Sequence, residues 1–150
     1  MATENDTSGS DTGGVVIYTQ LGSYGLSGWH HRTFVVDVPA SRTPLDLFIV
    51  PGPGASGENV KVRAWVTVHV AASIPTAMTK IVEASFTRSG SSLFKIGGDL
   101  TDQREVLGAT SADMVLAVSS TDVAIQCTPD NSQASNWSFL IEWQRGNSSP

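Results

Sequence analysis

The chain has 150 residues, 40% of them hydrophobic, and a formal net charge of −5. This length suffices for one domain with a buried core but not for two ordinary domains, and nine scattered lysines and arginines exclude the basic surface that binds nucleic acid. No apolar run approaches the roughly 20 residues that span a bilayer, so we expect a single domain that binds neither nucleic acid nor membrane.

The first 14 residues are polar and acidic, with no apolar residue after Met1 and Ala2. Such a segment cannot form a core of its own, and it lacks the basic and apolar parts of a signal peptide, which indicates synthesis in a cytoplasm. We predict an extended polar arm over residues 1–14 that contacts a neighbouring subunit, followed by one domain over residues 15–145 and a short tail over 146–150. The arm residues expected to make contacts are Asn5, Asp6 and Asp11.

Strand patterns follow the arm in close succession. Short apolar runs at 15–19, 33–38 and 46–50 are each bounded by Gly, Pro or Ser clusters. Residues 59–70 then alternate strictly, which is typical of a strand with one buried face. Small apolar residues occupy one face of this segment, and the other face is mixed, with Lys61, Arg63, Trp65, Thr67 and His69.

The second half of the chain reads as two hairpins and a final strand. Residues 80–98 turn around Arg88–Ser92, with an inward set of Val82, Ala84, Phe86, Phe94 and Ile96. Residues 113–128 turn around Ser119–Asp122, and residues 136–144 alternate once more. Helical periodicity is absent, so we predict an all-β fold of about eight or nine strands. The expected form is an antiparallel β-sandwich, jelly-roll-like, with an open barrel as the alternative.

The segment Gly52–Gly57, GPGASG, matches the glycine spacing of a dinucleotide-binding loop. That loop requires a helix start whose free N–H groups hold the pyrophosphate. Here the segment leads directly into the strand over 59–70, so we interpret it as a Pro/Gly hairpin loop.

Three acidic residues, Asp99, Asp102 and Glu105, suggest a calcium site if their loop curls. The spacing lacks the alternating carboxylates and central Gly of a calcium loop, and Arg104 lies among them, so a solvated loop is favoured. The single Cys127 has no nearby cation or helix start to stabilise a thiolate, which indicates a buried apolar filler. No catalytic set is singled out, and we expect no enzyme activity, metal or cofactor.

The segment Trp29–Arg32, WHHR, holds two of the three histidines. If it is extended, His30 and His31 point to opposite faces and cannot reach one ion, and only His69 remains as a further histidine ligand. Tryptophan beside arginine is favoured at interface centres. The predicted contact residues are therefore Trp29, His30, His31, Arg32, Arg63, Trp65 and His69.

Two segments match a pattern of strand and turn residues that is found in a known protein family. In 80–98 an alternating strand ends in a small residue, an aromatic and an arginine, and a glycine turn leads to an apolar strand that ends in glycine. In 123–144 a Val-x-Ile strand and a polar loop precede an Asn-Trp dipeptide; the positions are Ala84, Phe86, Arg88, Gly90, Gly97, Val123, Ile125, Asn136 and Trp137. Over residues 44–144 the chain thus resembles a β-sandwich domain of tailed-bacteriophage virion proteins. The resemblance implies an assembly role and brings no catalytic residue.

From this resemblance we expect a non-enzymatic virion component made in the host cytoplasm. The main hypothesis is a capsid decoration (cement) protein, a homo-oligomer with a trimer favoured, that binds the major capsid protein or another virion protein. The alternative is a tail or head-fibre module that binds a host glycan or receptor, with Tyr24, Trp29 or Trp65 stacking on sugar rings. An enzyme such as a cupin is disfavoured, since its clustered histidines are lacking.

Overall fold

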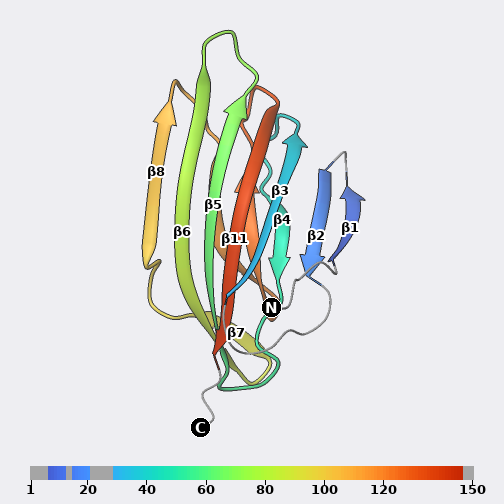
Figure 1. Ribbon diagram of the computed structural model, residues 1–150, viewed down its shortest axis with the longest axis vertical. Coiled ribbons are helices and arrows are strands. Elements are labelled where there is room, and N and C mark those ends of the chain that lie inside the picture. Colours follow the sequence, from blue (N-terminus) through green and yellow to red (C-terminus); the bar gives the residue numbers. More distant parts are fainter. Residues whose placement is uncertain (1–6, 13–14, 21–28, 147–150) are drawn as a thin grey trace.

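A computed structural model describes residues 7–12, 15–20 and 29–146, and every regular element in them is a β-strand. The strands form two sheets that lie face to face (Figure 1). The five-stranded sheet has the order β1 (Thr7–Thr12), β2 (Val15–Gln20), β4 (Leu45–Val50), β10 (Asp122–Thr128) and β9 (Asp113–Ser119). The six-stranded sheet has the order β3 (His30–Val38), β11 (Ser135–Gly146), β5 (Asn59–Val70), β6 (Thr76–Ser89) and β7 (Ser92–Lys95), and β8 (Thr101–Leu107) also pairs with β6.

The predicted antiparallel β-sandwich is confirmed. All paired strands are antiparallel except β2 and β4, which run parallel where Tyr18 lies opposite Phe48. The structure adds two strands to the predicted ones, β1 within the predicted arm and β8 within the predicted loop. The described residues include no helix long and apolar enough to cross a membrane.

The core lies between the sheets and follows the alternation of the long strands. The valines of β5 and the aromatic residues of β11 are buried, including Trp137 and Trp143. The indole N–H of Trp137 donates to Ser135 Oγ at 2.8 Å, so this buried donor is satisfied. Full burial of each such side chain contributes roughly 1.5–3 kcal/mol, which makes the two-sided strand pattern the main determinant of the fold.

The hairpin of β6 and β7 corrects one prediction. Phe94 and Ile96 are 53% and 49% exposed, whereas Leu93 is buried. The reason is register: Leu93 lies opposite Arg88, on the face of Phe86, and Phe94 lies opposite Thr87, on the other face. A shift of one residue exchanges the two faces of a strand, so Phe94 and Ile96 project away from the core.

Strand β8 replaces part of the predicted solvated loop. Strand β7 pairs only with residues 86–89 of β6, and β8 pairs with residues 77–83 of the same edge. Nearly all of β8 is exposed, on both faces. Its sequence therefore shows no apolar alternation, which is why the strand was not predicted.

The GPGASG segment is a loop, as predicted, although it crosses from β4 in one sheet to β5 in the other and closes no hairpin. The Arg88 side chain donates to the carbonyl oxygen of Pro53 at 2.9 Å, and the Gly52 N–H donates to the Asp122 carboxylate at 2.8 Å. These bonds attach the loop to both hairpins beside it.

Asp130 joins three loops at one end of the sandwich. Its carboxylate accepts hydrogen bonds from Thr110 Oγ1 (2.6 Å), from the N–H and hydroxyl of Ser132 (both 3.0 Å) and from the Gln133 N–H (3.0 Å), and its carbonyl oxygen accepts one from the Ser41 N–H. Burial by itself raises the pKa of Asp130, but the bonds from Thr110, Ser132 and Gln133 outweigh it and lower the pKa to about 2.

Cys127 is fully buried in β10, which confirms the interpretation as an apolar filler. Burial raises the pKa of its thiol, and the charges of Asp46 and Asp113 raise it further. Because the thiolate is the reactive form, we expect the native protein to react with iodoacetamide about 100-fold or more slowly than the protein in denaturant. Mass spectrometry of alkylated samples measures both rates, and equal rates would contradict the buried position.

Candidate contact surface

The six-stranded sheet has one side that faces away from the five-stranded sheet, and we call this side the outer face. The pairing of β3, β11, β5 and β6 places its side chains in rows across the strands. From β3 to β6, the first row is His31, Glu142, Arg63 and Glu83, and the second row is Thr33, Leu140, Trp65 and Ile81. The third row is Val35, Ser138, Thr67 and Thr79, and the fourth row is Asp37, Asn136, His69 and Ala77.

Arg63 holds the centre of the first row. Its guanidinium carbon lies 4.8 Å from the ring centre of Trp29 and 5.5 Å from that of Trp65. Its two terminal nitrogens pair with Glu83 at 3.0 Å and Glu142 at 3.4 Å. Cation–π contacts and ion pairs thus fix the guanidinium from several sides, and the five side chains form one ordered cluster on an open surface.

The three histidines do not converge: His30 and His31 point to opposite faces of β3, as predicted for an extended segment. His30 lies on the core side of β3, where its ring is 5.6 Å from that of Trp143, and His31 lies on the outer face. His69 is in the fourth row, about 20 Å from the first row at the usual rise per residue. Within the described ranges, no group of three or more His, Cys, Asp or Glu is placed to hold a metal ion.

The outer face therefore brings together five of the predicted contact residues: Trp29, His31, Arg63, Trp65 and His69. Arg32 lies on the core side of β3, opposite Ile141, together with His30. Asn5, Asp6 and Tyr24 lie outside the described residues, and Asp11 lies in β1 opposite Val16. The predicted contacts of all these residues, and the division into arm, domain and tail, stay predictions.

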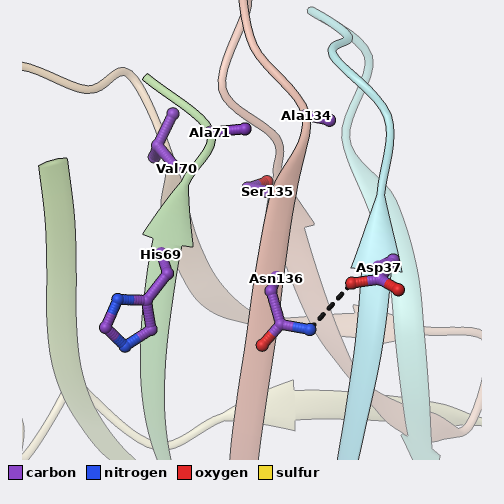
Figure 2. Close-up of a pocket in the computed structure, with 7 residues that line it drawn as sticks. All are labelled: Asp37, His69, Val70, Ala71, Ala134, Ser135 and Asn136. Atoms are coloured by element: carbon purple, nitrogen blue, oxygen red, sulfur yellow. Dashed lines mark hydrogen bonds between the residues drawn. The ribbon is translucent and has the colours of Figure 1, made fainter. Parts of the chain in front are cut away.

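The fourth row borders an open hollow at the end of three strands. Figure 2 shows Asp37, Asn136 and His69 side by side on β3, β11 and β5, with Ala71 and Ala134 beyond them. The Asn136 amide donates to the Asp37 carboxylate at 2.7 Å. Asp37 and His69 are exposed, and Asn136 is partly buried.

The acidic residues considered for calcium do not converge. Asp99 pairs with Lys95 at 2.9 Å, and Asp102 pairs with the buried Lys80 at 3.3 Å. Glu105 lies three residues further along β8, on the opposite face from Asp102. Two other carboxylates, those of Glu83 and Glu142, both pair with the Arg63 guanidinium.

Several members of the outer face were not predicted as contact residues, among them Glu83, Glu142, Leu140 and Ile81. Each is on the polar side of a strand whose alternation was recognised, so the alternation assigned the face correctly. The sequence does not show which side chains lie beside them on adjacent strands, because the strand order β11, β5, β6 depends on pairing between segments that are distant in the chain.

Comparison with known proteins gave no family model and no curated protein that matches the chain. Solved structures that are similar to it include two phage tailspike proteins. The Acinetobacter baumannii phage AM24 tailspike protein matches with a TM-score of 0.45 and 6% identity, over 77% of this chain and 26% of the tailspike. The Acinetobacter phage vB_ApiP_P1 tailspike protein matches with a TM-score of 0.42 and 12% identity, over 79% of this chain and 21% of the tailspike. The match thus covers between about a fifth and about a quarter of each tailspike.

Proposed function

We propose that this chain is a non-enzymatic structural module of a tailed-phage virion, of the tail or fibre type, which acts by binding another surface through its outer face. The virion context comes from the sequence resemblance over residues 44–144. The comparisons give no support to capsid decoration, the main hypothesis from sequence, and our proposal takes up the alternative, a tail or fibre module.

The observation that carries the contact function is the cluster around Arg63. Trp29 is 36% exposed, and Trp65 and Arg63 are partly exposed on the same face. Tryptophan and arginine are the residue types that dominate binding energy at interface centres, because a rigid apolar surface is combined with a fixed fork of donors. The ion pairs hold Arg63 in place before binding, so little side-chain entropy is lost on contact.

A host glycan is a second candidate ligand, since the exposed ring of Trp29 offers a stacking surface for a sugar. The Arg63 guanidinium lies near the ring centres of both Trp29 and Trp65, which reduces the free area of these rings. We therefore propose a protein surface as the main ligand.

Gold labelling of virions tests the placement. Antibodies raised against the purified chain are applied to particles produced from the encoding genome and imaged by electron microscopy. Label on the tail or fibres supports the proposal. Regular label over the head would support capsid decoration, and unlabelled particles that lack the chain by mass spectrometry would overturn the virion role.

A further inference from the structure

We propose that the outer face binds the outer face of a second copy of this chain, through a two-fold axis that runs across the strands between the second and third rows. Rotation about this axis places β3, β11, β5 and β6 each over the same strand of the other copy. The two copies of each strand then run in opposite directions. The inference deepens the proposed function and rests on it, because it names the partner of the same face.

Packing size is the first argument. The second row carries large apolar side chains, Leu140, Trp65 and Ile81, and the third row carries Ser138, Thr67 and Thr79 at the same strands. The proposed axis places Trp65 over Thr67 of the second copy. It likewise places Leu140 over Ser138 on β11 and Ile81 over Thr79 on β6. Large side chains over small ones fill the space between two sheets about 10 Å apart without voids or overlap.

Charge is the second argument. The same rotation places His31 over Asp37 of the second copy, Glu142 over the amide of Asn136, and Arg63 over the imidazole of His69. Three of the four first-row groups thus meet a side chain that can bond to them, and the fourth, Glu83, meets Ala77. No directly opposed pair in the four rows has like charges, so the face is complementary to itself.

An axis parallel to the strands is the main competing arrangement. It would pair Arg63 with Glu142 and His31 with Glu83 of the second copy, which suits the charges. It would also place Trp65 over Leu140 and Thr67 over Ser138, so that large side chains oppose large ones and small oppose small. Two rigid sheets cannot fit both rows at one separation, and we therefore prefer the axis across the strands.

The available area is sufficient for a stable pair. Five strands, β8 included, at about 4.8 Å and four rows along the strands give a face of about 600 Å² per copy, or about 1,200 Å² in total. This is the lower end of specific interfaces. The face also exposes apolar surface that a partner would cover, above all Val35, which is 62% exposed.

Molar mass in solution tests the pair. Light scattering at micromolar concentration should give about twice 15.8 kDa. In a dimer of Thr67→Glu, each copy would place a carboxylate under Trp65 of the other copy. We therefore expect the dissociation constant of the dimer to rise about 100-fold or more. Val115→Glu is the matched control on the exposed side of the other sheet, and it should keep the wild-type mass. Thermal unfolding confirms that both variants fold.

Several outcomes would overturn the inference. A wild-type monomer, a trimer as favoured from sequence, or an unchanged mass of Thr67→Glu would each do so. None of them would move the gold label, so a failure of this inference is distinct from a failure of the proposed function.

Cross-linking tests the axis itself. His31→Cys protein is mixed with Asp37→Cys protein and treated with a bis-maleimide that spans about 10 Å, the distance between packed sheets. The native Cys127 is buried and should not react. We expect one cross-linked dimer that contains both variants, and little product from either variant alone, because identical positions lie about 20 Å apart along the strands. Cross-linking of His31→Cys to Glu83→Cys in place of this product would identify the competing axis and refute ours.

Discussion

Replacement of Asp130 by Ala is expected to lower the free energy of unfolding by about 3 to 4 kcal/mol, because a charged acceptor of several hydrogen bonds is removed from a buried site. Thr110, Ser132 and Gln133 would lose their common acceptor. The three loops that end the sandwich near Asp130 would lose the bonds that hold them together. Urea unfolding at neutral pH measures the change.

The same carboxylate makes stability depend on pH. Its pKa is lowered from 3.8 to about 2 in the folded state, so the folded protein binds fewer protons than the unfolded chain in this range. The stabilisation is therefore complete above about pH 4 and is lost as the pH falls through 2. It amounts to about 2 kcal/mol. When the pH falls from 5 to 2, the free energy of unfolding of the wild type should decrease by about 2 kcal/mol more than that of Asp130→Asn.

The matched control is Asp99→Ala, which removes a carboxylate from an exposed pair with Lys95. Exposed pairs contribute about 1 kcal/mol or less. If the Asp130 and Asp99 variants unfold at the same urea concentration, the central place of Asp130 in the three loops is wrong.

Gly52→Ala is expected to reduce stability by about 3 kcal/mol or more, through forced backbone movement. A Cβ atom at this position would lie 1.7 Å from the Thr121 carbonyl oxygen and 2.8 Å from its carbon. Both are backbone atoms in the tight turn of β9 and β10, and they cannot rotate away as a flexible side chain can. The thermal midpoint of the variant should fall by about 6 to 12 °C, the shift that 3 kcal/mol gives at this chain length.

Gly54→Ala in the same loop is the control. Its nearest contact would be the flexible end of Glu58 at 3.8 Å, so its stability should change by about 0.5 kcal/mol or less. Equal effects at the two glycines would show that the loop needs glycine for general flexibility and not for a close approach at Gly52.

The alternating strands β5 and β11 could be predicted residue by residue, because one side of each is buried and the other is not. The same logic failed at β7, where a four-residue strand gave too short a pattern to fix its register. It could not detect β8, whose two faces are both exposed. A strand with one buried face requires apolar residues at alternate positions, and a strand without a buried face shows no such pattern.

The members of the outer face on β5 could be predicted from the sequence, but the side chains that lie beside them on other strands could not. Trp65 and Arg63 were recognised on one face, and Trp29 was recognised as an anchor. Their meeting, and the ion pairs of Arg63 with Glu83 and Glu142, depend on strand order between segments far apart in the chain. That order is set by the whole sandwich and cannot be read from any one segment.

The central claim is that the outer face is the contact surface of a virion module. The most direct measurement is the amount of this chain in particles produced from genomes that encode the wild type, Trp65→Ser or Val115→Glu, determined by quantitative mass spectrometry. We predict that Val115→Glu particles carry the wild-type amount and that Trp65→Ser particles carry about a tenth or less, although the purified variant folds. Wild-type amounts of the Trp65→Ser chain in the particles would contradict the claim.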